Sequence, residues 1–577
     1  MVWQVSGPAD LKQFALHKCG GVVDERTGLI DVETSPLVYE KLTQEYGLPL
    51  ANIDIAVQQQ YQQRRDRRAK LQAAVLNTSN IPEYPGLRAY QNSGIRFIMA
   101  GQRVAVLDGT GMGKTRQAAI AATLATRGKK LGRILVVCLK SARIGWEREW
   151  KAYVDRDIPI IIPRGGHEER LSALRNLPTH CVVIVNWQML SPATSHTRKE
   201  VKTRLEIQAE AWKKTLLAKG LWQVLIADEV HCAKDHHSRQ SERLFEIAQK
   251  TPYVIGLSAT PTDGKAHEWF GVLRVLDPWR FTSYTRFFNM FVEWVWSADG
   301  RYQQVVKNNG ANGAKNLAVL DDVLKDYCIG RKPGPDSGIP PIRYKSIFVE
   351  MEEAQQRAYD EMKRLYRITL EGGGELHAPN TLAQEMRLRQ VLLHPALIGA
   401  SGESAKVDAL IDYLQGIDND HNLVVYCSLI HSIGSTDAAM LNIIKRRIET
   451  ELHGKFSPRL LYADSSEAER ADIETWLGGE RNGRIALVSS RAGGTSLNLQ
   501  GADIGIRMDR PWSFTLDTQA LGRLPRLGQK SPFVVYVDLI VANSLDERVH
   551  ALLDSKQEFS EGRFRELMAH YIQTGGA

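Results

Sequence analysis

The segment Val104-Ala-Val-Leu-Asp-Gly-Thr-Gly-Met-Gly-Lys-Thr115 predicts one well-defined local structure. A short apolar run leads into a loop rich in glycine, and a helical pattern follows. This order is typical of a phosphate-binding loop, because glycines let backbone N–H groups approach phosphates and the helix N-terminus attracts negative charge. We expect Gly111 and Gly113 to line the phosphates. Lys114 would reach the β- and γ-phosphates and Thr115 would hold Mg²⁺, so the expected cofactors are ATP and Mg²⁺.

A second apolar run, residues 224–228, ends in the acidic pair Asp228 and Glu229. Acidic residues at the carboxyl end of a parallel strand lie where α/β sheets bind ligands. Asp228 would hold Mg²⁺, directly or through water, and Glu229 would polarise the attacking water. The alternative is a surface acidic turn, which the order of the two motifs disfavours.

A third strand-like run closes with Ser258, Ala259, Thr260 and Pro261. Its small hydroxyl side chains can relay hydrogen bonds between the acidic pair and a bound nucleic-acid strand. An ordinary strand-to-loop turn would have a similar sequence, so the motif gains weight only from its neighbours.

Two arginines far along the chain, Arg523 and Arg526, are candidates for the positive charge that phosphoryl transfer needs at the γ-phosphate. They are three residues apart, which predicts that they share one helix face. In isolation they would be ordinary surface arginines, so their interpretation depends on the other motifs.

Apolar β-branched runs alternate with helical patterns in two blocks, which predicts an α/β fold with two doubly wound parallel-sheet domains. The middle section, roughly 265–400, is mostly helical in pattern, with flexible loops expected at 307–315 and 371–375. We expect a small N-terminal accessory unit at 1–80, a first lobe at 81–345 and a second lobe at 346–577. The runs that predict strands are 104–108, 134–139, 181–186, 224–228 and 253–260 in the first block, and 423–428, 459–464, 484–490 and 533–541 in the second.

The predicted accessory unit ends in a polar helical stretch with a basic cluster. This cluster would either contact phosphates or form a solvated helix face. Its members are Arg64, Arg65, Arg67, Arg68 and Lys70.

The composition favours a soluble protein with a phosphate-rich partner. The net charge of +8 is a mild basic excess. The six cysteines are scattered and contain no C-x-x-C pair, which argues against a structural zinc site or a disulfide framework. No apolar run approaches the ~18 residues that span a bilayer, and the first residues do not form a signal peptide. We therefore expect a cytoplasmic protein without a membrane partner.

Taken together, the motifs resemble those of the Swi/Snf-type DNA-dependent ATPases of helicase superfamily two, whose two lobes are RecA-like. Asp108 stands at the usual first glycine of the phosphate loop, as it does in that family. Leu139 and Pro525 replace the usual proline and histidine. The matching segments are 87–91 (LRAYQ), 108–115 (DGTGMGKT), 140–150 (KSARIGWEREW), 228–231 (DEVH), 270–287 (FGVLRVLDPWRFTSYTRF), 386–395 (MRLRQVLLHP), 489–503 (SSRAGGTSLNLQGAD) and 519–529 (QALGRLPRLGQ).

The resemblance implies further site residues. Arg88 and Gln91 would bind the nucleotide, with Gln91 reading the adenine. Hydrolysis would be coupled to nucleic acid through His231, Ser258, Thr260 and Gln519. The candidate DNA contacts are Lys140, Ser141, Asn186, Ser428 and Thr495, each of which is also compatible with an ordinary loop position.

We therefore expect an ATP-dependent translocase on double-stranded or branched DNA, acting in replication, repair or recombination. By analogy, a chain of this size resembles a compact prokaryotic or phage member, similar to the annealing-helicase branch, in a bacterial or phage-infected host cytoplasm. One alternative is a processive strand-separating DNA or RNA helicase. Another is a nucleotide-gated subunit of a defence or restriction complex.

Overall fold

A computed structural model of the 577-residue chain describes most of its length. Thr495, and parts of the two loops predicted at 307–315 and 371–375, lie outside the described residues. The described residues are 2–24, 27–190, 214–218, 220–296, 303–306, 313–334, 337–365, 367–369, 375–378, 380–431, 439–462, 465–490 and 497–554.

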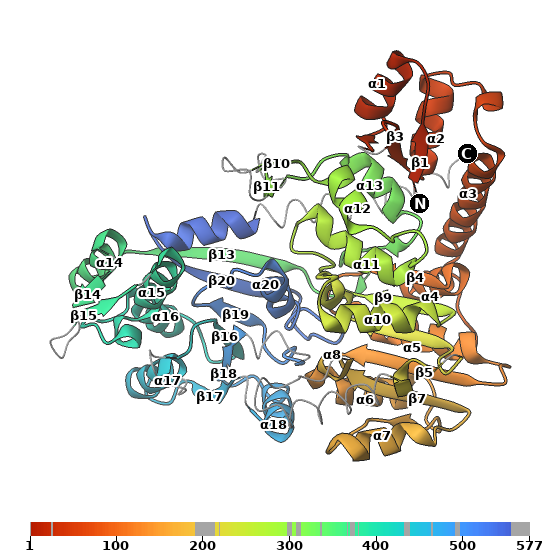
Figure 1. Cartoon of the computed structure of the whole chain (residues 1–577). Helices are drawn as coiled ribbons and strands as arrows, with labels where there is room; N and C mark the ends of the chain where they lie inside the picture. Colours follow the sequence, from red (N-terminus) through yellow and green to blue (C-terminus); the bar gives the residue numbers. More distant parts are fainter. Residues whose placement is uncertain are drawn as a thin grey trace. The chain divides into compact units, whose positions relative to one another are not determined.

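The chain divides into two compact units, each with its own parallel sheet (Figure 1). The first contains Met1–Gly109 and Gly113–Lys332, and the second contains Pro333–Gln557 and is also assigned the short segment Thr110–Met112. The division falls at Lys332/Pro333 rather than at the predicted 345/346. The strand that contains the predicted boundary, β13 (Ile342–Val349), therefore lies entirely in the second unit.

The first unit is built on a seven-stranded sheet in the order β12-β4-β9-β8-β5-β7-β6, and every pair in it is parallel. Alternate side chains of a strand enter two different cores: Leu135 and Val137 join one, whereas Ile134 and Val136 join the other. The strands are β4 (Arg103–Val106), β5 (Gly132–Cys138), β6 (Ile160–Ile161), β7 (His180–Asn186), β8 (Val224–Asp228), β9 (Tyr253–Leu257) and β12 (Cys328–Ile329).

Helices cover this sheet, which explains why its central strands are continuous apolar runs (Figure 1). The helices are α4 (Ala89–Gly101), α5 (Lys114–Thr126), α6 (Arg143–Tyr153), α7 (His167–Arg175), α8 (Trp187–Leu190), α10 (Arg239–Gln249), α11 (Trp269–Leu276), α12 (Tyr284–Phe291) and α13 (Leu317–Leu324). A short hairpin, β10 (Trp294–Trp296) with β11 (Gln303–Val305), follows α12.

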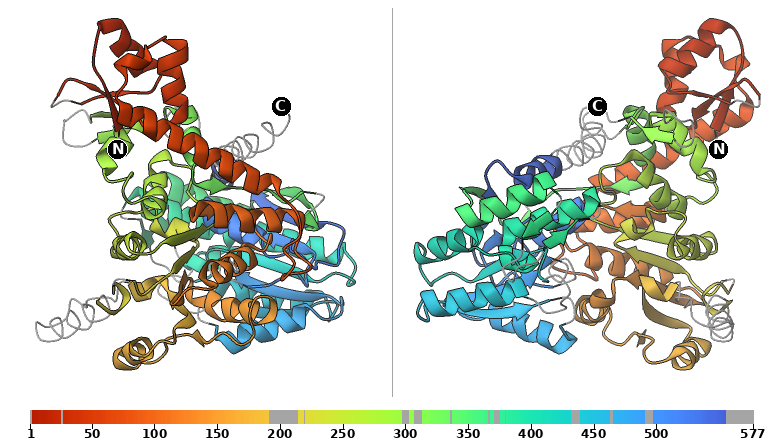
Figure 2. Two further views of the ribbon diagram at one scale, coloured as in Figure 1. Left: turned by 90° about the vertical axis from the view of Figure 1, so that its right-hand side faces the viewer. Right: turned by 60° about the vertical axis from the view of Figure 1, so that its left-hand side comes forward.

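The N-terminal residues form a three-stranded antiparallel sheet in the order β1-β3-β2, followed by the long helix α3. This helix leads from the small sheet to α4 and contacts it (Figure 2). The predicted accessory unit is thus part of the first compact unit. Its elements are β1 (Val2–Val5), α1 (Ala9–His17), β2 (Val22–Val23), β3 (Ile30–Glu33), α2 (Pro36–Glu40) and α3 (Ile55–Leu76).

Most of the basic cluster on α3 is neither free to contact phosphates nor part of a solvent-exposed helix face. Arg64 donates to the Thr34 hydroxyl at 2.7 Å. Arg67 donates to the Gly101 carbonyl at 3.2 Å. Arg68 is largely buried and pairs with Asp322 at 2.7 Å and with Asp326. Three of the five cations therefore anchor the N-terminal region, and only Arg65 and Lys70 are exposed.

A second buried cation joins the same region to the lobe. Arg280 pairs with Glu33 of β3 at 2.7 Å and with Asp326 at 3.1 Å, and it donates to the Thr34 carbonyl. Removing one partner of such a buried pair typically costs ~3–5 kcal/mol, because a charge is left uncompensated. The ion network thus explains why the N-terminal sheet packs as part of the first unit.

The second unit is built on a six-stranded parallel sheet in the order β13-β20-β19-β16-β18-β17. Its strands are β13 (Ile342–Val349), β16 (Leu423–Cys427), β17 (Ser457–Leu461), β18 (Arg484–Ser489), β19 (Ile504–Arg507) and β20 (Val534–Val541). Its helices are α14 (Glu353–Leu365), α15 (Thr381–Leu393), α16 (Ala405–Gln415), α17 (Ala439–Glu451), α18 (Glu467–Leu477) and α20 (Phe514–Leu521), and the small pair β14 (Arg367–Thr369) and β15 (Glu375–His377) lies between α14 and α15.

Strand β13 lies in the section expected to be mostly helical. Among the described residues it pairs only with β20, so it is an edge strand of the sheet. Its Arg343, Tyr344, Lys345 and Ser346 are exposed, and an edge strand does not need the continuous apolar run that marks a central strand. The predicted fold class of two parallel-sheet α/β lobes is confirmed. No helix in the described part of the chain is long and apolar enough to cross a membrane.

Candidate nucleotide and nucleic-acid site

The predicted motifs of the first unit follow neighbouring strands. The phosphate loop follows β4, the Ser258–Thr260 turn follows β9, the acidic pair ends β8, and Lys140 follows β5. These strands are adjacent and parallel in the order β4-β9-β8-β5. Their carboxyl ends therefore lie along one edge of the sheet, which is where open α/β sheets bind ligands.

The phosphate loop has the backbone conformation that its glycines allow. Gly111 and Gly113 have φ angles of 77° and 71°, and α5 begins immediately afterwards at Lys114. A Cβ at Gly113 would lie 2.5 Å from Nε2 of Gln91, and the positive φ of this position itself favours glycine. The Lys114 ammonium donates to the carbonyls of Asp108 and Gly109 at 2.7 and 3.1 Å. A flexible cation beside a glycine loop and a helix N-terminus fits a phosphate group.

Gln91 lies directly against this loop. Its side chain is only 2 % exposed, and its carbonyl oxygen accepts a hydrogen bond from the Arg88 backbone N–H at 3.0 Å. This contact fixes the start of α4, as a side chain three residues after the N-cap commonly does. The Arg88 residue itself is exposed. The structure thus brings Gln91 and the phosphate loop together.

Two tryptophans hold the first acidic residue. The Trp146 indole N–H, from α6, donates to the Asp228 carboxylate at 2.8 Å. The Trp187 indole, from α8, donates to the Asp228 backbone carbonyl at 2.9 Å. Burial, together with the neighbouring charge of Glu229, raises the pKa of Asp228 to about 6. A carboxylate whose negative charge is destabilised suits a divalent cation. Thr115, the other predicted Mg²⁺ ligand, lies in the first turn of α5.

Glu229 and His231 connect the acidic pair with the next strand. Glu229 adopts a left-handed backbone with a φ of 54°, a conformation that costs energy for a residue with a side chain. His231 Nδ1 lies 3.1 Å from the Glu229 carboxylate and 3.2 Å from the Ser258 hydroxyl, which itself donates to Glu229 at 3.4 Å. Burial opposes a charged His231 ring, but hydrogen bonds to Cys232 and Glu229 raise its pKa above the ordinary value.

Thr260 extends this chain of contacts. Its backbone N–H donates to the Ser258 hydroxyl at 3.1 Å. Its own hydroxyl is buried and finds no hydrogen-bond partner among the described residues. A buried hydroxyl without a partner is costly, which indicates that a further polar group satisfies it when the site is filled. His231, Ser258 and Thr260 therefore lie together with Glu229, as the predicted coupling role requires.

We expect the Trp146→Phe variant to need more Mg²⁺. The substitution removes the hydrogen bond that orients the charged Asp228 carboxylate, and such bonds contribute about 1.5–3 kcal/mol. The Mg²⁺ concentration for half-maximal ATPase activity should rise roughly ten- to hundredfold.

Trp150→Phe is the matched control for this measurement. Trp150 lies on the same helix and is fully buried, but its indole N–H has no partner in the described part of the chain. An unchanged Mg²⁺ requirement in Trp146→Phe would show that the indole does not orient Asp228.

The two candidate arginines lie in the second unit, beyond α20 rather than on a helix face. The helix ends at Leu521, with Gly522 as its C-cap, and Pro525 cannot continue it. Arg523 is 9 % exposed, and Arg526 donates to the Gly522 carbonyl at 3.1 Å. Burial, and then the adjacent Arg523 cation, lower the pKa of Arg526 to about 9, so Arg526 remains charged at neutral pH. Two neighbouring buried cations favour an anionic partner.

Gln519 precedes these arginines on α20. Its side chain is buried, and its amide nitrogen finds no hydrogen-bond partner among the described residues. Like the Thr260 hydroxyl, this amide indicates a polar group that completes the site.

The predicted DNA contacts differ in their exposure and in their hydrogen-bond partners. Lys140 is exposed after β5, and the neighbouring Ser141 hydroxyl is buried without a partner among the described residues. Asn186 is 8 % exposed and accepts a hydrogen bond from the Met189 N–H at 3.2 Å, so it holds the start of α8. In the second unit, the Ser428 hydroxyl contacts Asp509, whose carboxylate also accepts from the Ser428 N–H at 2.7 Å.

Asn186 and Ser428 therefore make structural contacts that their motifs did not suggest. Thr495 lies outside the described residues. The DNA-binding role of all five residues stays a prediction.

Trp146, Trp187 and Arg331 could not be recognised in the sequence as residues of the site. Trp146 lies inside a recognised segment, but nothing in its spacing indicated a contact with Asp228. Arg331 pairs with Asp108 at 2.7 Å although the two are 223 positions apart. Asp108 is fully buried, so the acidic start of the phosphate loop is a structural ion-pair partner.

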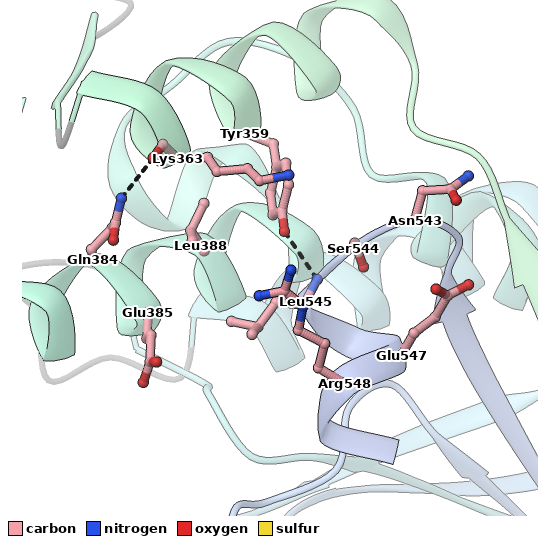
Figure 3. Close-up of a pocket in the computed structure, with 10 residues that line it drawn as sticks. All are labelled: Tyr359, Lys363, Gln384, Glu385, Leu388, Asn543, Ser544, Leu545, Glu547 and Arg548. Carbon is pink, nitrogen blue, oxygen red and sulfur yellow. Dashed lines mark hydrogen bonds between the residues drawn. The ribbon is translucent and has the colours of Figure 1, made fainter. Parts of the chain in front are cut away.

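A separate pocket of about 440 Å³ lies in the second unit. The side chains of Tyr359 and Leu388, from α14 and α15, point toward the segment that follows β20, and the Leu545 N–H donates to the Tyr359 hydroxyl at 2.9 Å (Figure 3). None of the predicted site residues lines this pocket. It is therefore distinct from the nucleotide and nucleic-acid motifs.

Two parallel α/β sheets with a phosphate loop and an acidic pair at one edge define a P-loop nucleoside triphosphatase of the two-lobed class. The SNF2-related domain matches residues 90–397, which is more than half of the chain, and the helicase conserved C-terminal domain matches residues 405–528. The chain belongs to the SNF2-related family, the DNA-dependent ATPases of helicase superfamily two.

Relatives with curated names include the human SWI/SNF-related matrix-associated actin-dependent regulator of chromatin subfamily A member 1. It is 25% identical over 478 residues, which cover 80% of this chain and 42% of that protein. Chromodomain-helicase-DNA-binding protein 7 of Gallus gallus is 23% identical over 501 residues, covering 80% of this chain and 15% of that protein. The chain thus spans less than half the length of these relatives. They support the Swi/Snf-type assignment and give no support to the annealing-helicase branch.

Among solved structures, the SWI2/SNF2 ATPase core of Sulfolobus solfataricus in complex with dsDNA is similar to this chain. The identity is 20% and the TM-score 0.37, and the match covers 87% of this chain and 97% of the other. The isolated core domain of the same organism gives a TM-score of 0.36 at 19% identity.

Proposed function

We propose that this chain is an ATP- and Mg²⁺-dependent translocase on double-stranded DNA. The observation that carries the proposal is the row of motifs at the carboxyl edge of β4, β9, β8 and β5. It places phosphate-binding, acidic and hydroxyl groups on neighbouring strands of one lobe.

In this proposal the phosphate loop and Lys114 hold the β- and γ-phosphates. Thr115 and Asp228 would bind Mg²⁺, which neutralises charge on the phosphates when bound. Glu229 would orient and polarise the attacking water, held in place by its contacts with His231 and Ser258. The fit is supported by the left-handed glycine backbone of the loop, the destabilised charge of Asp228 and the Thr260 hydroxyl, which has no partner among the described residues.

Arg523 and Arg526 would reach the γ-phosphate when the two lobes close, and would stabilise the charge of the transition state. Each cycle of closing and opening would then shift the grip on one strand of the duplex. Contacts to phosphates would position the DNA without reading its sequence. Lys140 and Ser141 are the candidates in the first lobe, and Ser428 is a candidate in the second.

The names of the relatives point to chromatin and DNA as what those proteins act on. For this chain we propose that translocation remodels protein–DNA complexes or branched DNA junctions, in replication, repair or recombination. The same motifs would serve a strand-separating helicase or a nucleotide-gated subunit of a defence complex. Experiment distinguishes these two alternatives from a translocase.

We expect the ATPase activity of the full chain to be stimulated strongly by duplex DNA and little by single-stranded RNA. The affinity for duplex DNA should fall as salt rises, because binding dominated by phosphate contacts releases counterions, with a log–log slope near −0.9 per neutralised phosphate. Duplexes of unrelated sequence should stimulate equally.

The test measures ATPase rates across a salt series with four nucleic acids: duplex DNA, branched DNA, single-stranded DNA and RNA. Stimulation by RNA alone would contradict the proposed substrate class. ATP binding without turnover on any nucleic acid would favour the nucleotide-gated subunit.

A further inference from the structure

Arg331 connects elements of the nucleotide site that are distant in sequence. Its guanidinium donates to both carboxylate oxygens of Asp108, at 2.8 and 2.7 Å, and to the Gln117 side-chain oxygen at 2.9 Å. Asp108 begins the phosphate loop, and Gln117 lies on α5, which follows that loop. Arg331 is 7 % exposed, so this contact is shielded from water.

The same side chain also holds the first turn of α4. It donates to the Ser93 hydroxyl at 2.9 Å and to the backbone carbonyl of Tyr90, and its guanidinium lies 5.4 Å from the centre of the Tyr90 ring. The planar, five-donor guanidinium makes these bonds in several directions at once, which a lysine ammonium cannot do with the same geometry. One side chain thus joins α4, the phosphate loop and α5.

The packing around Arg331 leaves little freedom in the spacing of these elements. A Cβ on Gly94 of α4 would collide with the Gln117 side chain and lie 2.7 Å from an Arg331 nitrogen. Gln91, one turn earlier on α4, already abuts Gly113 of the phosphate loop. The distance from α4 to the loop is therefore set by close contact on one side and by the Arg331 bonds on the other.

We propose that Arg331 is a positioning residue that determines base selectivity, by fixing α4 at the distance from the phosphate loop at which adenine is read. The inference rests on the proposed function, in which Gln91 reads the adenine while Gly113 and Lys114 hold the phosphates. Hydrogen bonds to a base fail when their donors and acceptors move by a fraction of an ångström to an ångström. Phosphate binding, which depends on the loop backbone and Lys114, tolerates such a shift of α4 better.

The test compares nucleotides, whose base would contact Gln91 on α4, with tripolyphosphate, which has no base. The affinities of the full chain for ATP, GTP, CTP and inorganic tripolyphosphate, each with Mg²⁺, are measured by competition with a fluorescent ATP analogue. Arg331→Lys is expected to reduce the preference for ATP over GTP and CTP roughly tenfold or more, while affinity for tripolyphosphate changes little. Ser93→Ala, which removes one bond without leaving a buried charge, is expected to give a smaller loss of the same preference.

Arg103→Lys is the matched control. Arg103 is also a partly buried arginine of the first unit, but its guanidinium donates to the carbonyls of Leu276, Thr251, Ala248 and Val275, none of which belongs to the site. It should leave the ATP preference unchanged.

Three results would overturn the proposal in distinguishable ways. Equal weakening of all four ligands in Arg331→Lys and Ser93→Ala would show that Arg331 only stabilises the lobe. An unchanged ATP preference in both variants would show that α4 is placed without it. A wild-type chain that binds no nucleotide would instead refute the proposed function itself.

Discussion

Glu229→Gln is expected to bind ATP with nearly unchanged affinity and to hydrolyse it about 10²–10⁴-fold more slowly. Glutamine keeps the size of the side chain and can still hydrogen-bond to His231 and Ser258, which lie 3.1 and 3.4 Å from the Glu229 carboxylate. It cannot accept a proton from the attacking water. Turnover is measured with saturating duplex DNA, and affinity by competition with a fluorescent ATP analogue.

A control variant at another acidic residue of the same lobe distinguishes the loss of the catalytic carboxylate from the loss of one negative charge. Glu246 lies on α10 and pairs with Arg243 one turn earlier. Glu246→Gln removes the same charge away from the motif edge and should hydrolyse ATP normally. Wild-type turnover in Glu229→Gln would show that another group activates the water.

Arg523→Ala and Arg526→Ala are each expected to lower turnover by ~10³-fold or more while ATP binding persists. Arg526 is charged at neutral pH, because its pKa stays at about 9 although burial and the adjacent Arg523 lower it and Glu474 partly opposes this shift. Their contribution would come in the transition state, after the lobes close, so binding to the first lobe should survive their loss. Single-turnover hydrolysis and nucleotide affinity are measured on each variant.

Arg459→Ala is the control for the second unit. Arg459 lies on β17, is partly exposed, and pairs with Asp472 on α18. It should not affect turnover. Near-normal turnover in both Arg523→Ala and Arg526→Ala would contradict the two-lobe mechanism, and loss of ATP binding in either would show that the arginine has another role.

The sequence predicted those parts of the fold that depend on local pattern. Buried strands such as β5 and β8 are continuous apolar runs, because helices cover both faces of a parallel sheet. The edge strand β13 carries Arg343, Tyr344 and Lys345 in exposed positions, so its pattern did not indicate a strand. The central strands were recognised, and the edge strand was not, because burial determines the apolar pattern on which strand prediction depends.

The site shows the same division. Lys114, Asp228 and Ser258 follow strands directly, so their motifs placed them correctly at one edge of the sheet. Arg331 contacts Asp108, and Trp146 contacts Asp228. These are tertiary contacts, which the spacing of residues in the sequence does not predict.

Charge patterns were the least informative features of the sequence. The cations of α3 suggested a phosphate contact or a solvated face, yet Arg68 forms a buried pair with Asp322. A run of like charges does not reveal whether carboxylates elsewhere in the chain will neutralise it. The structure shows that they do so for Arg68.

Movement along an intact duplex distinguishes a translocase from a strand-separating helicase, and displacement of a third strand from a triplex measures this movement. A third strand bound to a duplex is released by a motor that passes along the duplex, without any base pair of the duplex being opened. Strand separation, in contrast, must overcome ~1.4 kcal/mol for an average base-pair step. Release is followed with a labelled third strand, beside a forked duplex of similar length and with Glu229→Gln as the inactive control.

We expect ATP-dependent release of the third strand together with poor unwinding of the forked duplex, and neither reaction with Glu229→Gln. Rapid unwinding of a long forked duplex without triplex displacement would contradict it and would identify the chain as a strand-separating helicase.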